Sequence, residues 1–497
     1  PVSSLSGGWR MKLALMRAVM QKAQIMLMDE PTNHLDVINV QWVVDYLNSL
    51  PEVTCMIVSH DTAFLDKTVD HILHFDRLKL NTYRGNITDF VARFPEAASY
   101  FDLKNTRLKF HFPTPGPLQS GTRNRGRTLI EMKGVYFKYP GCEEYQIKDV
   151  NVKASMASRV AIVGANGAGK STMIKVFTGE NKATKGAVKT HPNLRFAYVA
   201  QHAFHHIEQH LDKSPNEYIC WRYQGGGDKE ALVKSTMVLS EKEEADMKMK
   251  WDVTWKDKDS GKMMKEKRVL EKIFSRRKER KVFVYECKWE GKAMKDNTWM
   301  TAERMAKMGT GFAKLVKAMD MRIAAQESMM ARPLTERNVE EHCAAVGLAA
   351  EQANHCRIKD LSGGQKVKVV LAACTWACPH LIILDEPTNY LDRDSLGALA
   401  NAIEEFEGGV VLITHNKEFA DATTRETWVV ANNRLDVSGD PEWEKYAAEA
   451  IEDALEEETK DAMGNIVKKK DVIPELEDMT RKQVKKYKKI CKEKIKR

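Results

Sequence analysis

The sequence LSGGQ at residues 361–365, followed by ILDEPTNYLD at residues 383–392, decides the fold. A second occurrence of the same pattern lies near the start of the chain, with LSGGW at residues 5–9 and LMDEPTNHLD at residues 27–36. In both occurrences 23 positions separate the Ser of the glycine-rich segment from the first acidic residue of the other segment. A fixed spacing repeated within one chain indicates a duplicated domain.

Both copies resemble ABC-type ATPases, in which an LSGG signature precedes a buried strand that ends in the Walker B pair Asp-Glu. The resemblance implies an α/β fold of tandem P-loop ATPase domains. No phosphate loop precedes the first signature, which follows Pro1 by a few residues. We therefore expect the first ATPase domain to be partial and the chain to be truncated at its N-terminus.

The phosphate loop occurs once, as GANGAGKST at residues 164–172, after an apolar run that predicts a strand at residues 160–163. Its glycines allow backbone N–H groups to wrap phosphates, and a helix predicted to begin near Lys170 adds partial positive charge. Lys170 is expected to reach the β- and γ-phosphates, and the Ser171 hydroxyl to coordinate Mg²⁺. The nucleotide-binding residues predicted here are Gly164, Asn166, Gly167, Gly169, Lys170, Ser171 and Thr172.

Five further residues follow the order of an ABC-type ATPase. Tyr139 is placed to stack on adenine, although an aromatic residue there also fits a core position. Gln201 is expected to sense Mg²⁺ and the attacking water. Asp385 is expected to hold the Mg²⁺ shell and Glu386 to polarise the water. His415, which follows a predicted strand, is expected to touch the γ-phosphate.

In dimers of ABC-type ATPases each nucleotide lies between the phosphate loop of one domain and the signature of the other. This resemblance implies that the loop at residues 164–172 is completed by the first signature, with Asp36 close by. The other composite site lacks a phosphate loop in this sequence, so we expect it to be inactive here. Both Walker B pairs are present, so neither copy is degenerate by that criterion. The predicted residues are Ser6, Gly7 and Gly8 for the first site, and Ser362, Gly363, Gly364, Asp29 (metal), Glu30 and His60 (both catalytic) for the second.

The composition favours a soluble cytoplasmic protein. The chain has 497 residues with a mean hydropathy of −0.46, and it contains no run of about 20 apolar residues that could form a membrane helix. Nine scattered cysteines fit a reducing compartment. The net charge of +9 is uneven, since residues 442–461 are acidic and residues 481–497 are rich in lysine. Such a tail is either a solvated terminus or an arm for RNA or anionic surfaces.

An insertion of unusual length separates Gln201 from Ser362, with 160 positions between them. It contains VLEKI at residues 269–273, YECKWEG at residues 285–291 and NTW at residues 297–299. These segments resemble a chromodomain, which implies a small curled sheet with a helix. The alternation of apolar residues before Trp289 predicts strands independently.

Chromodomains read methyl-lysine through an aromatic cage, and this sequence departs from that cage. Two of its three positions correspond to Arg268 and Lys292, and Trp289 alone is aromatic. A cation repels a methylammonium group and suits phosphate. We therefore favour RNA or ribosome contact for the insertion over a scaffold role, and a scaffold role over peptide reading.

Paired ATPase domains of this kind, with NHLD and NYLD after their Walker B pairs, resemble the translation-associated ABC-F class. A chromodomain-like insertion in the second ATPase domain is specific to the elongation factor 3 family. Three further stretches are similar to that family, at residues 59–61, 201–206 and 366–376, and the resemblance extends to about residue 445. It implies a cytoplasmic ribosome-associated ATPase that uses ATP and Mg²⁺ to release tRNA from the E site. The implied partners are the ribosome (rRNA and ribosomal proteins), the region of the E-site tRNA and elongation factor 1A, with no membrane.

The expected organisation has five parts: residues 1–112, the C-terminal part of a first ATPase domain; 113–127, a linker; 128–440, a second ATPase domain; 228–332, the chromodomain-like insertion within it; and 441–497, a charged tail. Three alternatives stay open. One is a relative of the same architecture that acts in ribosome recycling, termination or assembly. The others are a chromatin-binding ATPase and the detached ATPase part of a transporter.

Overall fold

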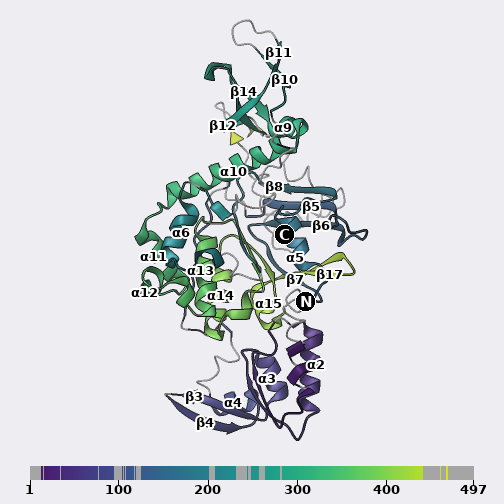
Figure 1. Cartoon of the computed structure of the whole chain (residues 1–497), viewed down its shortest axis with the longest axis vertical. Coiled ribbons are helices and arrows are strands. Elements are labelled where there is room, and N and C mark those ends of the chain that lie inside the picture. Colours follow the sequence, from purple (N-terminus) through teal and green to yellow (C-terminus); the bar gives the residue numbers. More distant parts are fainter. Residues whose placement is uncertain are drawn as a thin grey trace.

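The computed structural model describes residues 13–14, 16–18, 20–94 except 34 and 77, 103–104, 106, 108–116, 118, 125–200, 207–230 except 226, 243, 248–256, 263–279, 282–439, 459–460 and 466–467. Figure 1 shows three parts along the long axis of these residues: elements of the first copy at one end, the second ATPase domain in the middle and the insertion at the other end. The predicted site residues Ser6, Gly7, Gly8 and Gln201 lie outside the described residues.

The second ATPase domain is built on a six-stranded sheet in the order β18-β17-β7-β16-β15-β9. Neighbouring strands from β17 to β9 are parallel, and β18 alone is antiparallel to its neighbour. Every residue of β15 and β16 is buried, as expected where both faces of a parallel sheet are covered. These strands are β7 (Arg159–Val163), β9 (Phe196–Val199), β15 (Leu381–Asp385), β16 (Gly409–Ile413), β17 (Glu426–Ala431) and β18 (Arg434–Gly439).

One face of this sheet packs against helix α5 (Lys170–Phe177) and a three-stranded antiparallel sheet in the order β6-β5-β8. The strand predicted at residues 160–163 and the helix predicted to begin near Lys170 are both present. The antiparallel strands are β5 (Thr128–Phe137), β6 (Ile147–Ser155) and β8 (Lys185–Thr190).

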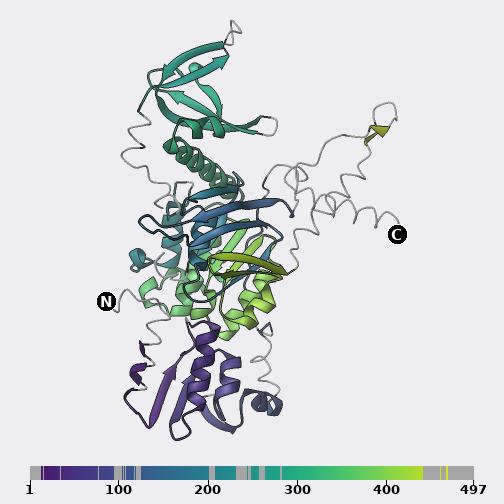
Figure 2. The ribbon, with the colours of Figure 1, turned by 90° about the vertical axis from the view of Figure 1, so that its right-hand side faces the viewer.

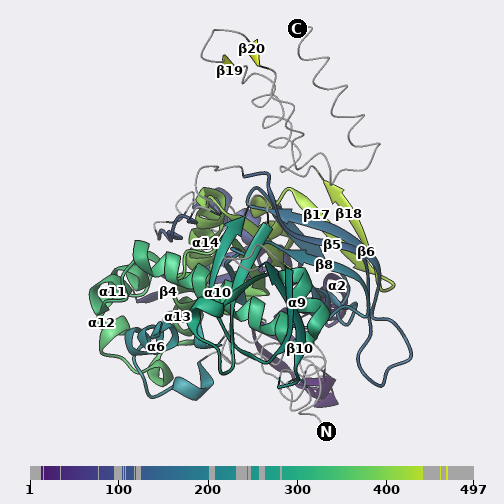
Figure 3. The same ribbon diagram turned by 90° about the horizontal axis from the view of Figure 1, so that it is seen from above.

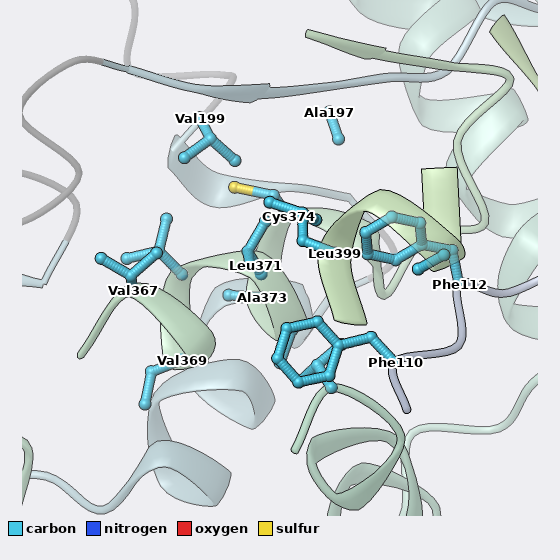
Figure 4. Packing of buried hydrophobic residues seen from close by; sticks show 14 of the residues in the cluster. Phe110, Phe112, Ala197, Val199, Val367, Val369, Leu371, Ala373, Cys374 and Leu399 are labelled. Atoms are coloured by element: carbon cyan, nitrogen blue, oxygen red, sulfur yellow. The ribbon is translucent and has the colours of Figure 1, made fainter. Parts of the chain in front are cut away.

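Helices cover the opposite face. Figure 4 shows Leu371 and Cys374 of the signature helix α13 beneath Val199 of β9. Phe110 and Phe112, from the segment that precedes β5, belong to the same cluster. The helices and 3₁₀ turns of this part are η4 (Glu208–His210), α6 (Pro215–Tyr223), α11 (Glu336–Ala345), α12 (Ala350–Asn354), η6 (Ile358–Asp360), α13 (Gly363–Thr375), η7 (Pro387–Tyr390), α14 (Arg393–Glu405) and α15 (Lys417–Thr423).

The insertion contains a three-stranded antiparallel sheet, a separate two-stranded sheet, a short helix and a long helix, α10 (Thr310–Ala331). Figure 2 shows α10 connecting these strands to the ATPase part, and Figure 3, from above, shows α9 and α10 in front of that part. Arg276 anchors the junction, donating to Asp320 of α10 at 2.6 Å and to Asn193 of the ATPase part at 2.7 Å. The other elements are β10 (Trp251–Lys256), β11 (Met263–Arg268), β12 (Leu270–Glu279), β13 (Val282–Trp289), η5 (Met294–Asp296), β14 (Thr298–Thr301) and α9 (Ala302–Met308).

The first copy contributes a parallel pair of strands, β1 (Ile25–Asp29) and β2 (Thr54–Val58). One face of this pair packs against α2 (Val37–Asn48) and α3 (Thr62–Thr68). The remaining elements are β3 (His71–Asp76), β4 (Lys79–Arg84) and α4 (Ile87–Arg93). In the predicted tail, the described residues form one short antiparallel pair, β19 (Thr459–Lys460) and β20 (Ile466–Val467).

Candidate nucleotide site

The phosphate loop joins the buried strand β7 to helix α5. Gly169 caps the helix with a φ of 100°, a left-handed conformation that favours glycine. A Cβ on Gly164 would lie 2.5 Å from the carbonyl oxygen of Val430, so this position leaves no room for a side chain. The loop therefore presents backbone N–H groups and the N-terminus of α5 to a phosphate group.

Lys170 is buried within this loop. Its Nζ donates to the carbonyl oxygens of Gly164 at 2.7 Å and Ala165 at 3.2 Å. Burial lowers the pKa of Lys170, and the carboxylates of Glu386 and Asp385 act against that shift. The ammonium group thus lies inside the phosphate loop, where P-loop proteins bind phosphate groups.

Ser171 and Asp385 supply the oxygen groups expected for Mg²⁺. Burial raises the pKa of Asp385 to about 6 and outweighs the Ser171 hydroxyl, which lies close enough to the carboxylate to lower that pKa. A hydroxyl and a carboxylate beside a phosphate loop match Mg²⁺, which takes few protein ligands and shares the rest with phosphates and water. The donor set present here therefore fits the metal.

Glu386 follows Asp385 in a left-handed conformation, with a φ of 53°. Its backbone N–H donates to the carbonyl oxygen of Ile413 at 2.9 Å, so the end of β16 fixes this conformation. Among the described residues its buried Oε1 has no hydrogen-bond partner. Burial, and then the charge of Asp385, raise the pKa of Glu386 to about 8. A buried carboxyl oxygen without a partner is suited to receive a water molecule.

His415 lies beside both groups. Its Nε2 is 3.4 Å from Oε1 of Glu386, 3.3 Å from Nζ of Lys170 and 3.2 Å from Oδ1 of Asn166. Burial, and then the charge of Lys170, lower the pKa of His415 to about 4. The imidazole is therefore neutral at neutral pH and can both donate and accept a hydrogen bond.

Tyr139 lies at the entrance to this loop. Its ring is exposed, and its hydroxyl is 3.2 Å from the Thr172 hydroxyl. Phe137 meets the ring edge-on, with 5.0 Å between ring centroids. Tyr139 therefore does not occupy a core position, because its ring is exposed beside α5.

The first copy touches the phosphate loop directly. The backbone N–H of Asn166 donates to Oδ2 of Asp36 at 3.2 Å, while Oδ1 of Asp36 caps α2 by accepting from the Asn39 N–H at 3.0 Å. Burial alone would raise the pKa of Asp36, but these hydrogen bonds outweigh it and lower the pKa. The two copies therefore meet at the loop, as the resemblance to ABC dimers implies.

A cavity of about 450 Å³ lies between the two copies, and Glu386 and His415 also line it. It brings Glu30 and His60 of the first copy opposite Ser362 and Gly364 of the second. The Ser362 side chain caps α13, which begins at Gly363. The groups predicted for the second composite site thus face one another, and Asp29 ends the adjoining strand β1.

Tyr198 contacts Asp385, and the sequence motifs do not predict this contact. Its hydroxyl donates to Oδ2 of Asp385 at 3.4 Å. The available signal was its position one residue before the end of β9, the strand that precedes Gln201 in the sequence. An aromatic residue in an alternating apolar run is expected in the core, so that signal did not single it out.

The residues at the chromodomain cage positions do not form a cage or a free basic surface. Trp289 is buried, and its Nε1 donates to Thr298 at 3.0 Å. The side chains of Arg268 and Lys292 both pair with Glu266, at 2.9 and 2.8 Å, and Arg268 is buried against the ring of Trp255. The buried Arg268 is therefore not available to phosphate, whereas Lys292 shares the single negative charge of Glu266 and stays partly exposed.

Comparison with known proteins identifies the family. The family model described as ABC transporter matches residues 1–33 and 147–389, more than half of the chain. Elongation factor 3 of Phytophthora infestans is 50% identical over 469 residues, which cover 94% of this chain and 44% of that protein. Elongation factor 3A of Saccharomyces cerevisiae is 45% identical over 481 residues, with the same two shares of 94% and 44%. The chain thus spans less than half the length of these curated relatives.

A solved structure named RNase-L Inhibitor aligns with 91% of this chain and 67% of its own, with a TM-score of 0.49 and 15% identity. Within the described residues no helix combines the length and the apolar character needed to cross a membrane. The match of the family model to both copies, together with the converging loop, Walker B and histidine residues, places this chain in the ABC transporter family of ATP-binding proteins.

Proposed function

We propose that the chain is the ATP-hydrolysing part of a ribosome-associated translation factor of the elongation factor 3 kind. One observation carries the ATPase part of this proposal: Lys170, Asp385, Glu386 and His415 converge on the phosphate loop, and Asp36 of the other copy lies against the same loop. The names of the curated relatives support the ribosomal part.

In the proposed reaction the N–H groups of the loop bind the phosphates, and Lys170 turns from the Gly164 and Ala165 carbonyls to the β- and γ-phosphates. In its ionised form, which the charge of a bound Mg²⁺ would favour, Glu386 accepts a hydrogen bond from the attacking water at Oε1. As the water oxygen bonds to the γ-phosphorus, the bond to the β–γ bridging oxygen breaks and Glu386 takes the water's proton. The products are ADP and inorganic phosphate. The neutral His415 stabilises the γ-phosphate by donating a hydrogen bond.

Mg²⁺ held by Ser171, with Asp385 beside it, would neutralise phosphate charge during this step. The same assignment places Gln201 and the first signature residues, Ser6 to Gly8, around the γ-phosphate, and Tyr139 on the adenine. In the second composite site Glu30, His60 and Asp29 would act opposite Ser362 to Gly364. These roles are carried over from the ABC dimer arrangement, and they stand as part of the proposal.

The finer function that we propose is release of tRNA from the ribosomal E site, driven by closure of the two copies on ATP in the cytoplasm. Elongation factor 1A is a proposed further partner. We propose that the insertion contacts the ribosome through exposed side chains of β12. There Arg277 stacks on the ring of Trp299 at 3.9 Å and pairs with Glu279, and Lys272 of the same strand is also exposed. Stacked aromatic and cationic side chains suit single-stranded RNA.

Turnover of ATP by this chain, with and without purified ribosomes, tests the proposal. We expect turnover that rises on adding ribosomes and is lost in Glu386→Gln. Turnover that ribosomes do not change would contradict the translation role while leaving the ATPase intact. Release of labelled E-site tRNA separates elongation from recycling, termination or assembly. Binding of histone peptides in place of ribosomes would instead favour the chromatin-binding alternative.

A further inference from the structure

Two hydroxyl groups converge on the Asp385 carboxylate from different elements. Tyr198 of β9 donates to Oδ2 at 3.4 Å, and Ser171 of α5 lies close enough to the carboxylate to affect its pKa. A phenol hydroxyl carries its proton at neutral pH and a carboxylate has none to give, so Tyr198 is the donor.

The strand register explains why Tyr198 reaches this carboxylate. β9 and β15 are parallel neighbours, and Tyr198 is paired with Ile383, two residues before Asp385. Because side chains alternate along a strand, Ile383 and Asp385 project from the same face of the sheet. The side chain of Tyr198 can therefore extend along that face to the end of β15.

The strand that carries Tyr198 is tied down along its length. The N–H of Arg195, directly before β9, donates to Nδ1 of His380 at 3.1 Å, and its carbonyl oxygen accepts from the His380 N–H at 2.7 Å. At the other end the carbonyl oxygen of Tyr198 accepts from Sγ of Cys374 at 3.6 Å. Because β9 is hydrogen-bonded at both ends, the side chain of Tyr198 has a fixed direction. A residue that orients another side chain requires this.

We propose that Tyr198 is a positioning residue, whose hydroxyl holds the Asp385 carboxylate in the orientation that Mg²⁺ of a bound nucleotide requires. The inference rests on the proposed function, since it takes Mg²⁺-nucleotide binding as given. Carboxylates that serve a metal are commonly oriented by hydrogen bonds from residues that do not touch the metal. A purely structural tyrosine would contribute its ring to the core and leave metal dependence unchanged.

The chain offers a matched control in Tyr218. It lies in the same domain, and its hydroxyl also donates to a carboxylate, that of Glu230. Tyr218 is fully buried, whereas Tyr198 is partly buried. Burial raises the pKa of both hydroxyl groups. The carboxylate partner of Tyr218 belongs to the cluster around Arg222 rather than to the phosphate loop. Tyr198→Phe and Tyr218→Phe therefore remove the same group at two places, of which one alone is proposed to serve the metal.

The test is equilibrium binding of a fluorescent ATP analogue to the chain and both variants, in excess Mg²⁺ and in EDTA. We expect Tyr198→Phe to weaken binding in Mg²⁺ by about threefold to tenfold, below the 10–100-fold typical of such residues because the 3.4 Å hydrogen bond is long. In EDTA the same variant should bind like the wild type. Tyr218→Phe should bind like the wild type in both media.

Equal weakening of Tyr198→Phe in Mg²⁺ and EDTA, or no weakening in either, would overturn the inference. Weakening by Tyr218→Phe to the same extent in Mg²⁺ would also overturn it, because the effect would then be general. If the wild-type chain binds the analogue equally well with and without Mg²⁺, the proposed function itself fails. The wild-type comparison thus separates the two failures.

Discussion

The two copies place a glutamate and a histidine in nearly the same local geometry. Glu30 and Glu386 have φ angles of 47° and 53°, and their N–H groups donate to the end of the neighbouring strand at 2.8 and 2.9 Å. The Glu–His distances are 3.5 and 3.4 Å. Burial differs: the His60 and Glu30 side chains are 55% and 23% exposed, against 16% and 5% for His415 and Glu386.

The source of this difference lies on one face of the strand pair. In the second copy Leu381, Ile383, Val411 and Ile413 are at most 1% exposed beneath α5 and the antiparallel sheet. The corresponding Ile25, Leu27, Met56 and Val58 of the first copy are all more than half exposed. A parallel strand pair is therefore enough to position the Walker B and histidine residues. The deeper burial in the second copy, and with it the pKa of about 8 for Glu386, accompanies the layer that carries the phosphate loop.

The largest expected effect separates the two glutamates by turnover. Glu386→Gln should lower ATP turnover by about 10²–10⁴-fold, the usual contribution of a positioned general base. Glu30→Gln should leave turnover of this chain almost unchanged, because the sequence carries one phosphate loop and it lies beside Glu386. Steady-state phosphate release by the two variants measures the difference. An equal loss in both would show that Glu30 also serves the site beside the loop.

The sequence predicts the phosphate-loop site better than it predicts the contacts made between strands. The spacing of the motifs predicts β7, α5 and the residues around the phosphate loop, because each lies within a few positions of a glycine or an acidic residue with a fixed role. Tyr198 and the buried Trp289 were not predicted in their actual places. Their contacts come from strand register and from packing against helices distant in sequence, and neither leaves a local pattern.

A smaller effect is expected in the pH dependence of stability. Burial raises the pKa of Glu386 from 4.5 to about 8, so between these values the folded state keeps a proton that the unfolded state releases. The free energy of unfolding contributed by this group therefore falls as the pH rises through that window. Removing it in Glu386→Gln should make the variant more stable relative to the wild type at pH 8 than at pH 6, by up to about 2 kcal/mol.

Chemical denaturation of the wild type, Glu386→Gln and Glu30→Gln at the two pH values measures this change. The pKa of Glu30 is also raised by burial, but His60 acts against the shift and the side chain is less buried. We therefore expect a smaller gain from Glu30→Gln. A larger gain from Glu30→Gln would mean that the covering layer does not set the difference between the copies.

The smallest effect concerns the aspartates that end the two repeated segments. Asp36 and Asp392 each cap the following helix, at 3.0 Å from the N–H groups of Asn39 and Ser395. Each Asp→Ala change should cost about 1 kcal/mol of stability through the lost cap. Asp36 alone also accepts from the Asn166 N–H of the phosphate loop, so Asp36→Ala should additionally lower turnover, by about fivefold.

Turnover and thermal unfolding of both variants distinguish the cap from the contact between copies. Asp392 lines the same cavity as Glu30, His60, Glu386 and His415, but among the described residues no hydrogen bond joins it to the phosphate loop. We therefore expect Asp392→Ala to lower stability without removing a hydrogen bond to the phosphate loop. If Asp392→Ala slowed turnover as much as Asp36→Ala, the loss would come from loosening of either helix. A loss confined to Asp36→Ala would instead mean that the first copy acts on hydrolysis through its hydrogen bond to Asn166.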